Sequence, residues 1–219
     1  MPRGLSVELV VQAAIEIADE DGLSAVTMAA VARRCGFTTM SLYRHVASKD
    51  ELVRRMLDTA LGTAPPLEPG GWRAGLAGWS RALLEILDRH PWGIDVPITG
   101  ILGTHAQLSW LDRALEAQAG TGLDDGSKAE IALLLNGYVF WAARLRFQVP
   151  PDDLEVIPMS IDVEQYPALA RAVASGIFED GSTPEDDFAF GLDRVLDGIE
   201  TLIAAQRSRP PSLPRTSSK

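Results

Sequence analysis

The stretch TMAAVARRCGFTTMSLYRHVASK, residues 27–49, constrains the fold of this chain more than any other segment. It predicts two short helices joined by a tight turn. Thr27 is a favourable N-cap for the first helix, and apolar residues follow it at helical spacing. Gly36 stands where a residue with positive φ would end that helix. Thr38 can then cap a second helix, with Leu42 at a buried position. Two helices in this arrangement are typical of proteins that read DNA.

The second helix of this pair separates an inner face from an outer one. Leu42 and Val46 are four residues apart, so they should share the inner face. We also expect Phe37, in the turn before the helix, to pack inward. The side chains left facing outward are Thr39, Met40, Ser41, Tyr43 and Arg44.

A third helix is predicted directly after the pair, with helical periodicity from Lys49 to about Leu61. Ser48 and Glu51 have the spacing of a capping box at its start. Lys49 lies in the first turn of this helix, where exposed N–H groups and the helix dipole favour a phosphate.

These residues resemble the DNA-binding domain of the TetR (tetracycline repressor) family. The matching positions are Thr27, Ala32, Gly36, Leu42, Tyr43, His45, Val46, Ser48 and Lys49. The segment from Val10 to Gly22 also resembles the family's first helix, and its inner stripe would consist of Ala13, Ala14, Ile17 and Ala18.

The resemblance implies roles for individual residues at a DNA interface. The residues expected against base edges are Thr38, Thr39, Met40 and Ser41. Tyr43, His45 and Lys49 are expected to hold phosphates, and Thr27 and Arg44 complete the expected DNA-binding set. Met40 departs from the small or cyclic residues expected at its position. It could contact a thymine methyl group, but it cannot form the paired hydrogen bonds that identify a base. The operator sequence therefore cannot be derived from these residues.

The overall charge argues at first against nucleic acid, since the 219-residue chain has a formal net charge of −10. That charge is distributed unevenly. Residues 1–61 hold 7 Lys and Arg against 8 Asp and Glu, whereas the remainder holds 13 against 22. Because Arg33, Arg34, Arg44 and Lys49 lie in or beside the helix-turn-helix, we expect a local basic face there.

The compartment is predicted to be the cytoplasm. Cys35 is the only cysteine, so an internal disulfide is impossible, and its apolar helix position predicts a core residue. The N-terminus lacks the long apolar stretch of a signal peptide, and no run approaches 18 apolar residues. We therefore expect no membrane association.

The turn-rich stretch GTAPPLEPGG, residues 62–71, predicts a domain boundary. The expected domains are a DNA-binding domain over 1–61, a ligand-binding and dimerisation domain over 62–206, and a disordered tail over 207–219. Helices are expected at 72–89, 98–118 with a break near Gly103, 127–148, 163–175 and 184–206. No segment shows strand alternation, so the predicted fold class is all-α, with a three-helix N-terminal domain and a larger helical C-terminal domain.

The helices at 127–148 and 184–206 carry more apolar surface than one small domain can cover, which predicts a homodimer. The stretch from Phe188 to Ala204 resembles the family's C-terminal region, where the corresponding helix pair forms a four-helix bundle with its copy. Gly137 and Gly191 would permit close approach of helices between subunits, or would relieve crowding inside one subunit. A dimer would place two recognition helices about 34 Å apart, one turn of DNA, on a pseudo-palindromic operator.

Aromatic residues of the second domain could line an apolar cavity for a planar or hydrophobic effector. The candidates are Trp79, Trp92, Trp110, Phe140 and Trp141, with Gln107, Asn136 and Arg144 as polar anchors. The alternative is that most of these aromatic residues are ordinary core.

The sequence offers no cofactor or metal site, because His90 and His105 lack the short spacing of metal ligands. An enzyme is poorly supported, since G-x-S-x-G is absent and GTGLDDG lacks dinucleotide-binding spacing. A helical protein-binding adaptor without DNA contact is the other alternative. The function that we predict is a homodimeric repressor, released from a palindromic operator by a small-molecule effector.

Overall fold

The computed structural model describes residues 4–97, 103–148, 164–175 and 183–208. Over these ranges the chain forms nine α-helices, two 3-10 helices and no strand, so the all-α fold class is confirmed. The elements are α1 (Val7–Asp21), η1 (Leu23–Ala25), α2 (Met28–Cys35), α3 (Thr39–Tyr43), α4 (Lys49–Leu61), α5 (Gly71–Arg89), η2 (Pro91–Asp95), α6 (His105–Ala117), α7 (Asp125–Gln148), α8 (Pro167–Ala174) and α9 (Pro184–Arg207).

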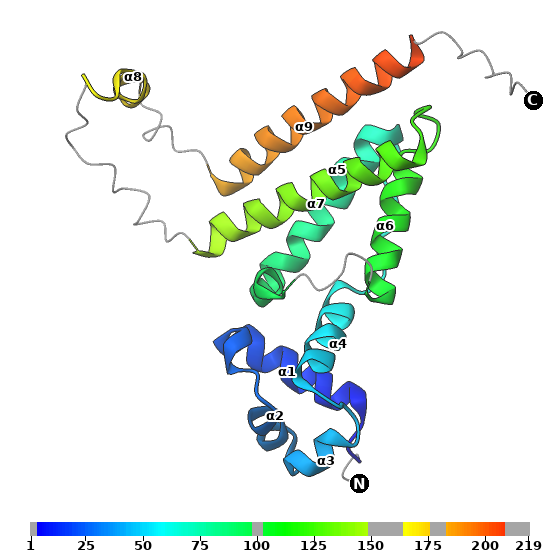
Figure 1. Ribbon diagram of the computed structural model, residues 1–219, viewed down its shortest axis with the longest axis vertical. Helices are drawn as coiled ribbons and strands as arrows, with labels where there is room; N and C mark the ends of the chain where they lie inside the picture. The colour runs from blue at the N-terminus through cyan, green and yellow to red at the C-terminus, as the bar shows by residue number, and fades with distance from the viewer. Residues whose placement is uncertain (1–3, 98–102, 149–163, 176–182, 209–219) are drawn as a thin grey trace, which may run out of the picture.

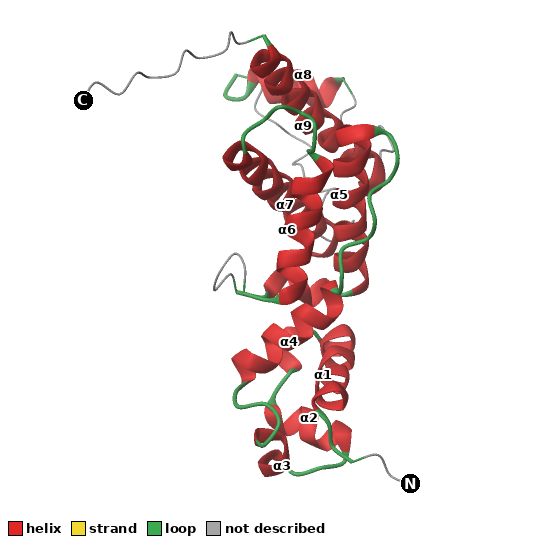
Figure 2. Ribbon diagram, turned by 90° about the vertical axis from the view of Figure 1, so that its right-hand side faces the viewer, coloured by secondary structure: helices red, strands yellow, loops and turns green. Residues whose placement is uncertain are grey.

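The helices form two lobes with separate cores. Figure 1 shows α1 to α4 in a small lower lobe and α5, α6, α7 and α9 in a larger upper lobe, and Figure 2 shows the same division from the side. The buried cluster of the lower lobe runs from Val10 to Met56 and also includes Trp92. The cluster of the upper lobe begins at Leu61 and ends at Ile203. The change of core therefore coincides with the end of α4.

The predicted caps of the helix-turn-helix are present. The Thr27 hydroxyl accepts a hydrogen bond from the backbone N–H of Ala30 at 3.1 Å, which fixes the start of α2. Gly36 ends α2 with φ +77°, a left-handed conformation that glycine adopts without a steric cost. The Thr38 hydroxyl accepts from the backbone N–H of Ser41 at 3.3 Å and so starts α3.

Two local predictions were wrong. Phe37 does not pack inward: it is 37% exposed, whereas Leu42 and Val46 are fully buried beneath α3. The capping box at α4 forms only in part. The Ser48 hydroxyl accepts from the backbone N–H of Glu51, but the Glu51 carboxylate accepts from Ala47, one residue earlier than predicted.

The upper lobe is built around α7, which packs against α5, α6, α9 and η2. The inner stripe of α9 consists of Phe188, Leu192, Leu196, Ile199 and Ile203. Leu202, by contrast, is 45% exposed. α8 buries none of its residues, and in Figure 1 it lies apart from the other helices.

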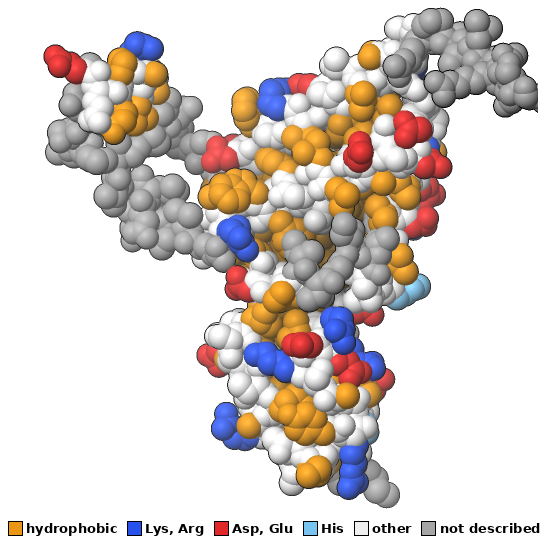
Figure 3. Space-filling view, in the orientation of Figure 1, with side chains coloured by type: hydrophobic (Ala, Val, Ile, Leu, Met, Phe, Trp, Pro, Cys, Tyr) orange, Lys and Arg blue, Asp and Glu red, His pale blue; other side chains and the backbone are white. Residues whose placement is uncertain are grey.

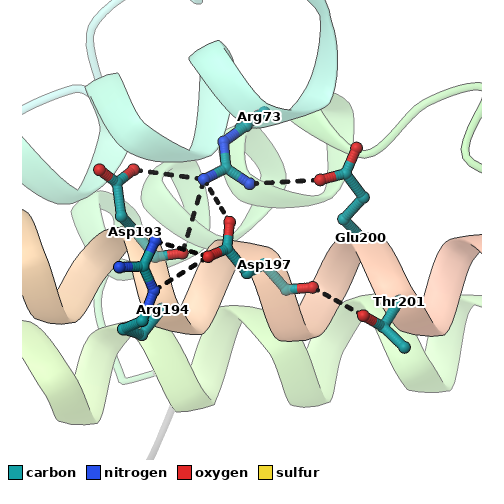
Figure 4. Close-up of polar contacts among 6 residues, drawn as sticks. All are labelled: Arg73, Asp193, Arg194, Asp197, Glu200 and Thr201. Atoms are coloured by element: carbon teal, nitrogen blue, oxygen red, sulfur yellow. Dashed lines mark hydrogen bonds and ion pairs between the residues drawn. The ribbon is translucent and has the colours of Figure 1, made fainter.

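An ion-pair network joins the first turn of α5 to one side of α9 (Figure 4). The Arg73 guanidinium donates to the Asp197 carboxylate at 2.8 Å and to that of Asp193 at 3.3 Å, and it lies 3.6 Å from Glu200. Arg194 donates to the same Asp197 carboxylate from within α9. These contacts set the position of α9 along α5.

The part of the expected disordered tail beyond residue 208 falls outside the described residues, as do residues 98–102 of the helix expected over 98–118. α9 itself continues to Arg207, and Ser208 is its C-cap. Along the described ranges, no helix combines the length and apolar character needed to cross a membrane.

Candidate functional site

The tip of the lower lobe presents the residues predicted to contact DNA. Thr27 is exposed at the start of α2, and Lys49 is exposed at the first position of α4. On and around α3, Met40 is 70% exposed and Tyr43 is 51% exposed. Thr38, Thr39 and Arg44 are also exposed, whereas Ser41 and His45 are half-buried.

α3 has only five residues, so its orientation depends on packing rather than on its own hydrogen bonds. Leu42 and Val46, both at 0% exposure, anchor its inner side in the lower core. On the outer side, the hydroxyls of Thr38 and Ser41 lie 3.0 Å apart and share a hydrogen bond. The anchored inner side holds the exposed side chains of α3 in a fixed direction.

The basic face is narrower than predicted, because Arg34 is engaged within the lobe. Its guanidinium pairs with the carboxylates of Glu20 and Glu16 on α1, and the hydrogen bond to Glu20 raises the pKa of Arg34. Among the described residues, neither Arg44 nor Lys49 forms an ion pair. Arg44 and Lys49 are both exposed, so they remain available to an anion. Figure 3 shows both basic and acidic side chains on the surface of the lower lobe.

Cys35 lies on the side of α2 that faces α1. Its thiol is 3.9 Å from the backbone carbonyl of Leu9, and burial raises its pKa. A raised pKa lowers the thiolate fraction, so the thiol is a poor nucleophile and fits a packing role.

Two of the predicted effector-binding residues meet in the core of the upper lobe. Trp79 on α5 and Trp110 on α6 form an edge-to-face pair with ring centroids 5.8 Å apart. The Trp79 indole N–H donates to the Trp110 carbonyl at 2.9 Å, and the Trp110 indole N–H donates to the Leu61 carbonyl at 3.2 Å. Both indoles are therefore hydrogen-bonded inside the protein. Phe140 packs against the same core, and Asn136 is half-buried one turn before it on α7.

The other four effector candidates lie elsewhere. Gln107 caps α6, because its side-chain oxygen accepts from the backbone N–H groups of Gly103 and Thr104. Trp92 belongs to the core of the lower lobe. Arg144 donates to the backbone carbonyl of Ile94, and Trp141 is 59% exposed on the surface of α7. The structure thus brings Trp79 and Trp110 together and leaves these four at separate positions.

Sequence reasoning missed the contacts that join the two lobes at α4. The Asp58 carboxylate of α4 accepts from the backbone N–H of Ala106, in the first turn of α6, at 2.7 Å. Ser109 on α6 accepts from the backbone N–H of Ala64 in the connector. These residues are 45 to 48 positions apart, and no local motif marks them. These bonds connect α6 to α4 and to the connector that follows α4.

An apolar face on α7 and α9 has no partner within the described residues. Its members are Leu133, Leu134, Trp141, Leu145, Phe190 and Leu202, each between 45% and 65% exposed. Figure 3 shows hydrophobic side chains gathered across this side of the upper lobe. An exposed apolar face that extends over two neighbouring helices is typical of protein interfaces.

Within the described part of the chain, no three His, Cys, Asp or Glu side chains are grouped so that they could hold a metal ion.

Two family models match the chain, one for each lobe. Residues 10–56 match the family described as bacterial regulatory proteins, tetR family. Residues 64–203 match the family described as tetracyclin repressor-like, C-terminal domain. The two matches meet at the connector that separates the lobes.

Known proteins resemble the chain over nearly its whole length. The transcriptional repressor DrrR1 of Streptomyces coeruleorubidus is 37% identical over 93% of this chain and 80% of that protein. The class C tetracycline repressor of Escherichia coli is 26% identical, with 90% and 92% coverage. The TetR family protein ActR of Streptomyces coelicolor, solved with (S)-DNPA, superposes with a TM-score of 0.78 at 25% identity over 91% of this chain and 98% of that one. This chain therefore belongs to the TetR family of bacterial transcription regulators.

Proposed function

We propose that this protein is a homodimeric repressor that binds a pseudo-palindromic operator and is released from it by a small-molecule effector. The observation that carries the proposal is the tip of the lower lobe. There a buried anchor holds α3 so that Met40 and Thr39 are exposed, and Lys49 opens the neighbouring helix. The relative DrrR1, which is 37% identical, is named a repressor, and this supports repression rather than activation.

Within this proposal, the contacts divide into base reading and phosphate binding. Thr38, Thr39, Met40 and Ser41 read base edges, while Tyr43, His45 and Lys49 hold phosphates, with Thr27 and Arg44 beside them. The dipole at the start of α4 adds to the charge of Lys49, since the start of a helix favours an anion. We retain the division into domains 1–61 and 62–206.

The apolar face of α7 and α9 is the proposed dimer interface. A second copy would cover the exposed Trp141 and Phe190 and would remove their apolar surface from water. Gly137 and Gly198 support close approach on this face, because a Cβ added at either would meet nothing within 4 Å in the chain itself. A two-fold axis between the copies presents two α3 helices to the two halves of an operator.

The effector is proposed to act from the upper lobe through α6. Trp79, Trp110, Phe140 and Asn136 remain the effector-contacting candidates that lie in or against the upper core. The solved complexes of ActR with (S)-DNPA and with actinorhodin support a small organic effector. A shift of α6 moves α4 through the bond from Ala106 to Asp58, and the separation of the two α3 helices changes.

The protein is proposed to act without catalysis. The family is one of transcription regulators, which supports binding rather than a reaction in the upper lobe. The adaptor alternative predicts that the exposed cations of the lower lobe have no role in duplex binding.

Selection of duplexes from a random pool by the purified protein tests the proposal. We expect enrichment of a pseudo-palindrome whose half-sites are centred about one helical turn apart. The control is the variant with Tyr43→Ala and Lys49→Ala, which should enrich no sequence at the same salt concentration. Enrichment of no duplex by the unchanged protein would contradict DNA reading and would favour the adaptor.

A further inference from the structure

A second joint connects the two lobes, away from α4, and it centres on Asp19 of α1. The Asp19 carboxylate accepts a hydrogen bond from the indole N–H of Trp92 at 2.7 Å and lies 2.9 Å from Nδ1 of His90. Because a carboxylate oxygen is an acceptor, Nδ1 is the protonated nitrogen of His90 in this contact. Trp92 is only 2% exposed, and its ring is packed into the core of the lower lobe although η2 belongs to the upper one.

The same short helix is tied to α7 on its other side. Arg144 of α7 donates to the backbone carbonyl of Ile94 at 3.1 Å, and η2 packs against both α5 and α7. A continuous path therefore runs from α7 through η2 to α1. The path does not include α4 or α6, and it begins on a helix of the proposed dimer interface.

Part of this joint is open. A groove of about 270 Å³ runs along it, lined by Ala18, Asp19, Gly22, Pro91, Trp92, Ile94, Asp95 and Phe147. The groove leaves part of α1 apart from η2 and the end of α7, while the Trp92 ring and Val96 pack against the lower core. The hydrogen bonds of Asp19 add polar contacts beside the buried Trp92 ring, at the edge of this groove.

We propose that Asp19, Trp92 and His90 form an orientation latch that fixes the lower lobe relative to α7 and thereby sets the spacing of the two reading helices. One attachment at α4 leaves the lobe able to rotate about the connector, and a second attachment removes that freedom. A lobe already fixed in the binding orientation loses less conformational freedom on meeting the operator. The latch rests on the proposed function, and Asp19 and Trp92 are positioning residues that do not touch DNA.

The test compares two DNA probes: the full duplex that the unchanged protein selects from a random pool, and a duplex that keeps one half-site with the other half scrambled. Trp92→Phe keeps a buried ring but removes the N–H. Asp19→Ala removes the acceptor, and Asp19→Asn restores an oxygen that can accept from the indole. Thermal unfolding of each variant shows that the lower lobe remains folded.

We expect Trp92→Phe and Asp19→Ala each to raise the Kd for the full duplex about fivefold or more, the lower end of typical coupling between sites. The Kd for the half-site duplex should stay unchanged, because one lobe meets it alone. Asp19→Asn should recover most of the full-site affinity. The double variant should lose no more than the worse single variant, since both remove the same bond.

Equal weakening on both probes would overturn the latch, because a merely damaged lobe weakens both. An unchanged or tighter full-site Kd would also overturn it. If the unchanged protein selects no duplex, the proposed function fails and the latch fails with it. If selection succeeds and the variants bind the full duplex normally, only the latch fails.

Discussion

At the scale of single residues, the reading surface combines side chains of two kinds. Met40 projects an apolar side chain that is 70% exposed, which can contact a thymine methyl group but supplies no hydrogen-bond code. Lys49 projects a charge from the first turn of α4, where helix N–H groups already favour a phosphate. The first kind of contact depends on base sequence, and the second does not.

Lys49→Ala should weaken binding to every duplex by a similar factor. Each lost phosphate contact lowers the slope of log Kd against log salt by about 1, hence by about 2 for a dimer. Titrations at several salt concentrations measure the slope. Arg81→Ala, which removes an exposed cation from α5, should leave the slope unchanged. A change in the ranking of duplexes for Lys49→Ala would contradict its assignment to a phosphate.

Met40→Ala should instead alter the ranking of duplexes, because its side chain is assigned to base reading.

At the scale of elements, the crossing of α7 and α9 depends on one glycine. A Cβ added at Gly191 would lie 2.8 Å from Cζ of Tyr138 and closer still to its hydroxyl. That hydroxyl donates to the Phe188 carbonyl at 2.8 Å, and the two rings stack with centroids 5.4 Å apart. Gly191 thus relieves crowding inside one subunit, which was one of the two alternatives open for it. A Cβ added at Gly137 would face open space, so of these two glycines only Gly137 keeps the other alternative, the close approach of helices between subunits.

Gly191→Ala should lower the free energy of unfolding by about 1–3 kcal/mol, the usual cost of overpacking. The cause is the displacement of Tyr138 from its hydrogen bond and from Phe188. Denaturant titration measures the change. In a double-mutant cycle, Tyr138→Phe should recover part of the loss, because the hydroxyl is the nearest obstacle. Additive effects of the two substitutions would show that the close contact is not the cause.

The network at Arg73 should make the attachment of α9 depend on pH. Hydrogen bonds from Arg73 and then from Arg194 hold the pKa of Asp197 below its ordinary value of 3.8. A carboxyl whose pKa is lower in the folded state than in the unfolded state stabilises the fold at pH values above its unfolded-state pKa. This stabilisation is lost as the pH falls through the folded-state pKa.

The difference in unfolding free energy between the unchanged protein and Arg73→Met should therefore be constant at neutral pH. It should shrink as pH falls below about 4. Denaturant titrations across this pH range measure it. Arg81→Met on the same helix is the control and should show no such trend. A difference that grows on acidification would contradict the role of Asp197.

At the scale of the whole molecule, the two lobes differ in net charge and in proposed role. The lower lobe is nearly neutral and exposes Arg44 and Lys49 at its tip, whereas the rest of the chain is acidic. The upper lobe carries the apolar face of α7 and α9, far along the long axis from α3 in Figure 1. An acidic upper lobe disfavours DNA contact anywhere except at the tip.

Trp141→Glu should shift the protein toward monomer, because it places a charge at an apolar position of the proposed dimer interface. Sedimentation over a range of protein concentrations measures the dimer Kd, which should rise. Full-site DNA affinity should fall with it, while half-site affinity stays. Arg81→Glu, at an exposed position of α5, is the matched control. An unchanged dimer Kd for Trp141→Glu would place the interface elsewhere.

Much of the lower lobe was predictable, because its signals are local. The hydroxyls of Thr27 and Thr38 and the φ of Gly36 act within four residues, and the burial of Leu42 follows from helical spacing. The effector candidates were harder. Aromatic composition does not distinguish Trp110, in the upper core, from Trp92, in the lower core, or from Trp141 on the surface. Long-range packing alone separates these three cases.

The sequence by itself determined where α2, α3 and α4 begin, which faces of α2 and α3 are buried, and that the tip carries Met40 and Lys49. Capping and periodicity act over one or two turns, so they can be read along the chain. Only the tertiary structure decided that Arg34 is neutralised by α1, that Asp58 holds α6, and that Asp19 receives Trp92 from 73 residues away. Such contacts depend on how the helices pack, and no local pattern specifies their partners.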